Sequence, residues 1–233
     1  MNIYIRPYIA VTVLLVIFSC SKKMMGTTQP QSTTPTANMT FLALGDSYTI
    51  GQSVEPMFRF PVQTTALLRN LSINFSEADI IATTGWTTND LLNAIAAAPP
   101  KKDYSVVTLL IGVNNQYQGK SIEEYKTQFR QLLMQSIEYA AGNRKHVFVL
   151  SIPDYSVTPF AAGRDRAKIA AEIDAFNAAN KNISIELGVN YLDITGISRE
   201  NDPELIASDG LHPSSKQYGR WAALLAPLIQ SKL

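Results

Sequence analysis

The chain has 233 residues, enough for one or two domains, and 20 lysines and arginines nearly balance 19 aspartates and glutamates. The net charge of +1 gives no basis for a nucleic-acid partner, which would require a strongly basic surface. The 46% hydrophobic content is typical of a globular protein, and the single cysteine excludes an internal disulfide.

The N-terminal segment is predicted to be an export signal rather than part of the fold. Arg6 precedes an apolar run over residues 9–18, about half the length that a membrane-spanning helix needs. Residues 17–20, Ile-Phe-Ser-Cys, resemble the end of a bacterial lipoprotein signal, which is cut before a cysteine that then receives lipid. We therefore expect a signal peptide at residues 1–19 and a lipidated Cys20 that holds the protein on a membrane of the bacterial cell envelope. The alternatives are a plain signal peptide and an anchor helix.

A polar segment follows the expected lipidation site. Residues 21–38 are rich in serine, threonine, glutamine and proline, a composition that cannot bury a core. We expect residues 20–38 to form a flexible tether that begins at the lipidated cysteine. The folded part is then a single domain over residues 39–233, which is an ordinary size for one domain.

Within this domain, apolar runs that end at polar or glycine-containing turns predict strands. The run over residues 104–111 is almost entirely aliphatic or β-branched, as is typical of a strand with both faces covered. The predicted strands cover residues 41–44, 77–82, 104–111, 146–152 and 189–194.

Amphipathic helices are predicted between these strands, because apolar residues recur there at helical spacing. Capping-box patterns begin at Ser121 and Ser214, and Pro227 is expected to kink the last helix or end it early. Alternating strands and helices predict a parallel sheet with helices on both faces. The helices are expected over residues 58–71, 87–98, 122–141 and 164–187 and from residue 215 onward.

Polar residues gather in the loops that follow the predicted strands. If the strands are parallel, these loops open at one edge of the sheet, where open α/β folds bind ligands. Ser47 offers a hydroxyl there, and a serine becomes a good nucleophile when a base takes its proton. His212 is the candidate base, and Asp209, three residues earlier, can accept a hydrogen bond from Nδ1 and leave Nε2 free for Ser47.

An acyl-transfer site also needs donors for the negative oxygen of the tetrahedral intermediate. Three groups in the same loops can supply them: the backbone N–H of Ser47, the backbone N–H of Gly85 and the side-chain amide of Asn114. The same residues have simpler interpretations, since Ser47 can cap a helix and Gly85 and Asn114 can sit in turns.

Taken together, these residues resemble the SGNH (GDSL-type) hydrolase family. The resemblance implies that Ser47 is the nucleophile, that Gly85 and Asn114 are oxyanion donors and that Asp209 and His212 complete the triad. It also implies a flavodoxin-like three-layer α/β/α fold with about five parallel strands, and esterase or lipase-type activity without a metal or other cofactor. The residues that carry it, in chain order, are Gly45-Asp46-Ser47, Gly85, Gly112-Val-Asn114 and Asp209-Gly-Leu-His212-Pro.

One position departs from the family pattern, and several residues compete for the assigned roles. The family usually has aspartate where this chain has Asn115, which keeps the shape and loses the charge. Asp154 and Asp193 are rival triad acids without the local connection to His212, and His146 is expected to be structural. The stretch 112–121 looks like a phosphate-binding loop but has six residues between its glycines instead of four.

The expected substrates are carboxylic esters, with short acyl or acetyl groups on carbohydrate or lipid. The alternative is a glycan-binding surface lipoprotein on a hydrolase scaffold, with little or no turnover. No metal is expected, because the two histidines are remote in sequence and the one cysteine is expected to be lipidated. Four aromatic residues near the expected site are candidates to line a pocket or to belong to the core: Tyr48, Trp86, Tyr117 and Tyr155.

Overall fold

The computed structural model describes residues 1, 3, 4, 38–200 and 202–233. The predicted signal peptide, Cys20 and nearly all of the predicted tether lie outside these residues. The chain divides into a unit of residues Met1–Pro35 and a unit of residues Thr36–Leu233, and the fold described below is that of the second unit. Within the described residues, no helix has both the length and the apolar character needed to cross a membrane.

A single five-stranded parallel sheet forms the centre of the second unit, in the order β2-β1-β3-β4-β5. This order is that of flavodoxin-like folds, in which the chain reverses its direction of winding between β1 and β3. The predicted fold class is therefore confirmed. The strands are β1 (Phe41–Gly45), β2 (Asp79–Ala82), β3 (Val106–Leu110), β4 (Val147–Leu150) and β5 (Asn190–Leu192).

The strands differ in burial according to their place in the sheet. Every residue of β1, β3 and β4 is buried, whereas the edge strands β2 and β5 are partly exposed. Central strands with both faces covered have no polar face, which explains why their sequences read as continuous apolar runs. The core sits between this sheet and the helices on either side of it.

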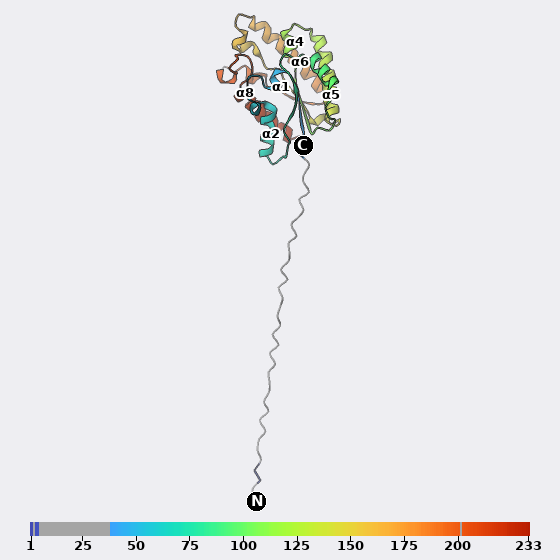
Figure 1. Ribbon diagram of the computed structural model, residues 1–233, viewed down its shortest axis with the longest axis vertical. Coiled ribbons are helices and arrows are strands. Elements are labelled where there is room, and N and C mark those ends of the chain that lie inside the picture. The colour runs from blue at the N-terminus through green and yellow to red at the C-terminus, as the bar shows by residue number, and fades with distance from the viewer. Residues whose placement is uncertain (2, 5–37, 201) are drawn as a thin grey trace. The chain divides into compact units, whose positions relative to one another are not determined.

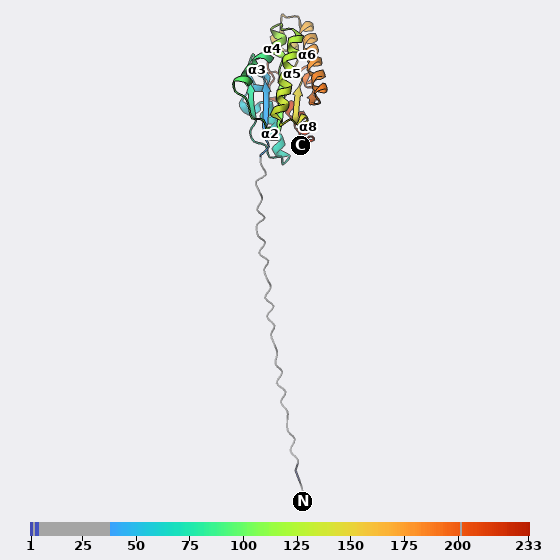
Figure 2. The same ribbon diagram turned by 90° about the vertical axis from the view of Figure 1, so that its right-hand side faces the viewer.

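Helices cover both faces of the sheet (Figure 1). The helices α2 (Phe60–Asn70) and α8 (Ser215–Gln230) pack closely on each other on one face. On the other face α5 (Ile122–Tyr139) packs between α3 (Thr88–Ala97) and α6 (Arg166–Glu186) (Figure 2). The three layers place the carboxyl ends of the strands at one edge, where the loops carry the predicted site residues.

Short helical segments occupy several of the connecting loops, and the sequence periodicity did not predict them. They are α1 (Ser47–Ile50), α4 (Val113–Tyr117), α7 (Thr195–Ser198) and the 3₁₀ turns at Pro56–Phe58, Arg144–His146, Tyr155–Val157, Pro159–Ala161 and Pro203–Leu205.

The helix starts predicted at Ser121 and Ser214 are confirmed, and one of the two effects expected of Pro227, an early end of the last helix, is wrong. Ser121 Oγ accepts the N–H of Glu124 at 3.1 Å, and Ser214 Oγ accepts the N–H of Gln217 at 3.3 Å. Helix α8 continues through Pro227 to Gln230, so Pro227 does not end it. Pro227 lies near the helix end, and the residue whose carbonyl loses its partner, Ala223, is exposed to water.

Candidate active site

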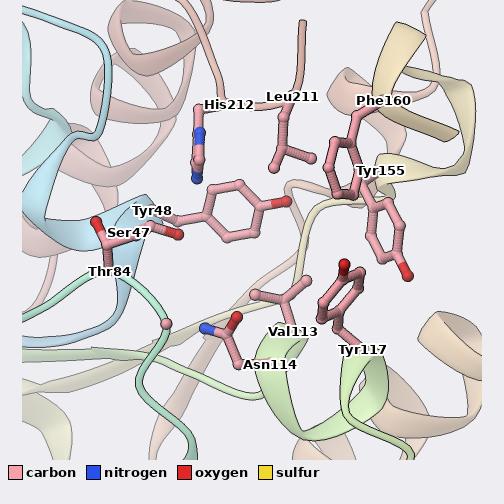
Figure 3. A pocket seen from close by; sticks show the side chains of 11 residues that line it. Ser47, Tyr48, Thr84, Val113, Asn114, Tyr117, Tyr155, Phe160, Leu211 and His212 are labelled. Carbon is pink, nitrogen blue, oxygen red and sulfur yellow. The ribbon is translucent and has the colours of Figure 1, made fainter. Parts of the chain in front are cut away.

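A cavity of about 170 Å³ opens at the carboxyl ends of the central strands and brings most of the predicted site residues together (Figure 3). Ser47 follows β1, Gly85 follows β2 and Asn114 follows β3, while His212 comes from the loop before α8. The full lining is Ser47, Tyr48, Thr84, Gly85, Val113, Asn114, Tyr117, Tyr155, Phe160, Leu211 and His212.

Ser47 is the first residue of α1, at the point where the chain leaves β1. A side chain at Gly45 would overlap Thr49 Oγ1 and the carbonyl oxygen of Leu110, so only glycine allows this close turn. Asp46 caps α1, because its Oδ1 accepts the N–H of Tyr48 at 3.0 Å. The turn presents Ser47 to the cavity and gives Asp46 a structural role.

Asp46 is fully buried, and this changes its titration. Loss of hydration raises the pKa of Asp46 to about 7, although hydrogen bonds from the N–H groups of Tyr48 and Gly112 partly offset the rise. The unfolded chain ionises this group near its ordinary value of 3.8. Between these two values the native state keeps a proton that the unfolded state has lost, so stability from this group is complete below about pH 4 and is lost as the pH rises to about 7.

We therefore expect the unfolding free energy of the native protein, relative to Asp46→Asn, to fall by about 2–3 kcal/mol between pH 5 and pH 8. The asparagine amide oxygen can still accept the N–H of Tyr48, so the cap is retained. Urea denaturation of both proteins at each pH measures the difference. Asp103→Asn, at an exposed position, is the control, and an identical pH dependence of the native protein and Asp46→Asn would contradict the prediction.

Asp209 and His212 form a close pair beside the cavity. Asp209 Oδ2 lies 2.6 Å from His212 Nδ1, and Asp209 Oδ1 accepts the N–H groups of Leu211 and His212 at 2.9 and 3.0 Å. Gly210 turns the chain between them with a φ of +73°. Burial by itself would raise the pKa of Asp209, but hydrogen bonds from Ser53 and from His212 outweigh it and hold that pKa well below its ordinary range. Asp209 is thus an ionised acceptor, and the proton of the pair sits on Nδ1.

With its proton on Nδ1, the His212 ring offers Nε2 as an acceptor. Figure 3 shows the ring above Ser47, with a ring nitrogen on the side of the serine. The described hydrogen bonds include none between Ser47 Oγ and His212, and such pairs are often long until a substrate binds. The His212 side chain is 10% exposed, so the acceptor faces the cavity and not bulk water.

A residue that the sequence analysis missed, Ser53, also contacts Asp209, the candidate triad acid. Its hydroxyl donates to Asp209 Oδ2 at 2.6 Å, the same oxygen that binds the His212 ring. Ser53 has a φ of +67°, a left-handed conformation that is unfavourable for a residue with a side chain. Strained residues are often found at functional sites, and here the strained residue donates its hydroxyl to the carboxylate of Asp209.

We expect Ser53→Ala to lower kcat/KM for ester hydrolysis about tenfold, because a hydrogen bond to a charged group that orients the base is lost. Ser53→Gly lacks the hydroxyl too, but glycine adopts the left-handed conformation freely. The free energy of unfolding of Ser53→Gly should therefore be about 1 kcal/mol higher than that of Ser53→Ala. Steady-state kinetics and urea denaturation of both variants separate the two effects. If Ser53→Gly regained the lost activity, the backbone rather than the hydroxyl would be responsible.

The three predicted oxyanion donors lie along one side of the cavity. Gly85 has a φ of +88°, and a side chain there would meet no atom, so the backbone conformation alone favours glycine. The described hydrogen bonds leave the N–H groups of Ser47 and Gly85 without an acceptor. The Nδ2 atom of Asn114 donates one hydrogen to the carbonyl of Trp86 at 2.9 Å, which fixes the amide and leaves its second hydrogen available.

Asn115, the departure from the family pattern, is buried and connects α4 to the start of α3. Its Oδ1 accepts the N–H of Thr88 at 3.0 Å, and its Nδ2 donates to the Thr88 hydroxyl at 2.7 Å. The hydroxyl in turn donates to Gln128 Oε1. An aspartate cannot donate to that hydroxyl, so the amide suits the partners present in this chain.

The competing residues lie in other environments. Asp154 is buried against Arg199, with 2.9 Å between Oδ2 and Nε, and Asp193 accepts the Ser151 hydroxyl at 3.0 Å. His146 lies before β4, at the edge of the sheet opposite the cavity. Residues 112–121 contain helix α4 rather than an open loop around an anion. Within the described residues, no three histidine, cysteine, aspartate or glutamate side chains gather as a metal site would require.

The aromatic residues predicted near the site divide into two groups. Tyr48, Tyr117 and Tyr155 line the cavity, whereas Trp86 contributes only its carbonyl to the Asn114 amide. Phe160, which the sequence analysis did not select, completes the wall from the 3₁₀ turn Pro159–Ala161.

The doubly wound fold holds a serine, a histidine and an aspartate near the carboxyl ends of its strands, which is the residue set of the serine hydrolases. The sequence matches the GDSL-like lipase/acylhydrolase family over residues 43–220, and the chain belongs to this family. The resemblance found in the four sequence blocks is therefore confirmed, and the protein is an ester-hydrolysing enzyme. Comparison with curated proteins gives no match.

Several solved structures share the fold at low sequence identity. TesA is 15% identical, with a TM-score of 0.66 over 84% of this chain and 100% of its own. The lipase Lip_vut3 from a goat rumen metagenome is 20% identical, with a TM-score of 0.65 over 82% of this chain and 97% of its own. A variant of Axe2, an acetyl xylan esterase from Geobacillus stearothermophilus, is 19% identical, with a TM-score of 0.60 over 82% of this chain and 94% of its own. At these identities the likeness establishes the fold.

Proposed function

We propose that the protein is a serine esterase that cleaves carboxylic esters through an acyl-Ser47 intermediate. The observation that carries the proposal is the Asp209–His212 pair, whose imidazole keeps its proton on Nδ1 and turns its free side toward Ser47. Ser47, His212 and the donor groups of Gly85 and Asn114 line one cavity. These are the parts that acyl transfer requires.

In the first step, Ser47 Oγ attacks the ester carbonyl carbon while His212 Nε2 takes the hydroxyl proton. The carbonyl oxygen becomes negative and receives hydrogen bonds from the N–H groups of Ser47 and Gly85 and from Nδ2 of Asn114. The tetrahedral intermediate then collapses, the carbon–oxygen bond to the leaving group breaks, and His212 gives its proton to the departing alkoxide. The products of this step are an alcohol and the acyl-Ser47 ester.

In the second step, His212 takes a proton from a water molecule that attacks the acyl-Ser47 carbonyl. Collapse of the second tetrahedral intermediate returns the proton to Ser47 Oγ and releases the carboxylic acid. Asp209 stays ionised throughout and stabilises the imidazolium formed in both steps, consistent with the pKa of Asp209 being held well below its ordinary range.

We propose short acyl or acetyl esters of carbohydrate or lipid as substrates, and a protein anchored through Cys20 in the bacterial envelope. The N-terminal sequence supports the location, because an anchored enzyme meets envelope polysaccharides and lipids. The small volume of the cavity supports a short acyl group. The fold is shared with an acetyl xylan esterase, which is compatible with carbohydrate esters.

The proposal is tested with protein that lacks residues 1–38, by hydrolysis of 4-nitrophenyl esters from acetate to decanoate and by labelling with a fluorophosphonate. We expect Ser47-dependent hydrolysis that is strongest for the short esters, and covalent labelling of Ser47 that also requires His212. Folded protein that neither turns over any ester nor reacts with the probe would overturn the proposal and favour a binding protein on this scaffold.

A further inference from the structure

The cavity beside Ser47 is small enough to limit the part of the substrate that it accepts. Its volume is about 170 Å³, close to that of a cavity of about 150 Å³ that holds a benzene ring. It extends from Ser47 and His212 toward Phe160 and Tyr117 (Figure 3). A sugar chain or a whole lipid does not fit into this volume, so an alcohol of that size has to lie outside, and the acyl group takes the cavity.

Tyr48 places a polar atom inside this cavity. Its side chain is 3% exposed, and its ring packs edge-to-face on His212 and Trp221, with centroids 5.9 and 6.5 Å apart. Figure 3 shows the hydroxyl directed away from Ser47, into the space bounded by Phe160 and Leu211. Within the described residues, this hydroxyl forms no hydrogen bond.

The other phenol groups of the wall are placed differently. The hydroxyl of Tyr155 points away from the cavity in Figure 3. The hydroxyl of Tyr117 accepts a hydrogen bond from Arg164 at 3.3 Å, and Tyr117 is 47% exposed. Burial, with the nearby charge of Asp46, raises the pKa of Tyr48 well above its ordinary value, so its hydroxyl remains a neutral donor. The hydroxyl borders the open space of the cavity, so an acyl group that fills this space displaces water from the hydroxyl and is favoured when it supplies an acceptor in its place.

We propose, building on the ester hydrolysis proposed above, that the cavity binds a compact oxygenated acyl group: one of up to about six carbon atoms with an ether, hydroxyl or oxo oxygen that accepts a hydrogen bond from Tyr48. The apolar side chains of Val113, Phe160 and Leu211 surround the carbon atoms of this group. Tyr48 is the specificity-determining residue, and plain alkyl esters are poorer substrates because they leave its hydroxyl unpaired.

The test compares esters that share a leaving group and have acyl chains of equal length. The 4-nitrophenyl esters of pentanoic, 3-methoxypropanoic and ethoxyacetic acids differ by replacing one methylene with oxygen, at two positions along the chain. Each kcat/KM is divided by the rate of alkaline hydrolysis of the same ester, which removes the difference in intrinsic reactivity. We expect at least one oxygenated ester to be preferred over pentanoate about five- to tenfold, the value of one net hydrogen bond.

Tyr48→Phe removes only the hydroxyl, and the ratio of the corrected kcat/KM for the oxygenated ester to that for pentanoate is expected to fall close to one in this variant. Tyr104→Phe, which removes a phenol hydroxyl bound to Asp79 at the far edge of the sheet, should keep the preference.

The length of the acyl chain is a second test. The octanoate ester is expected to react at least tenfold more slowly than the pentanoate ester, and Phe160→Ala should reduce this difference in rate because it opens the wall of the cavity.

The outcomes separate this inference from the proposed function. Ser47-dependent hydrolysis without a preference for either oxygenated ester, or with a preference that persists in Tyr48→Phe, overturns the inference and leaves the esterase proposal standing. The first of these outcomes is measured in the native protein alone, so it does not depend on the folding of Tyr48→Phe. Absence of any Ser47-dependent hydrolysis overturns both.

Discussion

Replacing Ser47 by alanine is expected to lower kcat for ester hydrolysis by at least about 10⁴-fold, since the proposed acyl intermediate forms on the hydroxyl of this residue. The residual rate reflects binding and oxyanion stabilisation, which the backbone N–H groups of residues 47 and 85 still supply. The change is measured by steady-state hydrolysis of 4-nitrophenyl acetate and butanoate, with fluorophosphonate labelling as a second readout that should disappear.

The fold should tolerate this change well. Ser47 is buried, and within the described residues its hydroxyl makes no hydrogen bond, so alanine leaves no broken contact. Urea denaturation of Ser47→Ala should therefore stay close to that of the native protein. Ser231→Ala, on a hydroxyl bound to the carbonyl of Leu228 at the end of α8, is a matched control. Near-native activity in Ser47→Ala would assign the nucleophile to another residue.

The parts of this molecule that the sequence predicted are those in which one local pattern has one physical outcome. Buried strands such as β3 must be apolar along their whole length, because both faces are covered. Ser121 and Ser214 mark helix starts, because their hydroxyls replace missing backbone partners. Asp209 and His212 are three residues apart, so one turn of the chain is enough to bring them together, and their pairing can be predicted from the local sequence.

The parts that the sequence did not predict depend on contacts between remote segments or on very short elements. Ser53 donates to Asp209 across 156 positions, and a serine with positive φ has no signature in the sequence. Phe160 joins the cavity wall from a three-residue 3₁₀ turn, which is too short to show a period. Helices α1 and α4, of four and five residues, are missed for the same reason.

Helix α8 does not end early at Pro227, because the effect of a proline depends on its position in the helix. A proline in the middle of a helix removes a hydrogen bond and distorts the turns on both sides of it. In α8 the proline lies within the last turn, and water can satisfy the carbonyl of Ala223. The sequence pattern contained the proline but not the exposure that makes it tolerable.

Replacing Asp209 by asparagine is expected to lower kcat by about 10⁴-fold, and the geometry gives the reason. The N–H groups of Leu211 and His212 both donate to Oδ1, so the asparagine oxygen must occupy that position. The amide nitrogen then takes the place of Oδ2, 2.6 Å from His212 Nδ1 in the native protein, and can only donate. Nδ1 becomes the acceptor, the ring proton moves to Nε2, and His212 can no longer take a proton from Ser47.

This argument predicts which properties survive in Asp209→Asn. The backbone donors keep their acceptor, so the loop fold and the KM for short esters should change little, while kcat collapses across the range from pH 6 to 9. Hydroxide that attacks without the base should give a residual rate that rises steadily with pH. Asp193→Asn, at the rival carboxylate that accepts the Ser151 hydroxyl, should keep near-native kcat. If Asp193→Asn lost a comparable part of kcat and Asp209→Asn lost none, the triad acid would be Asp193 and not Asp209.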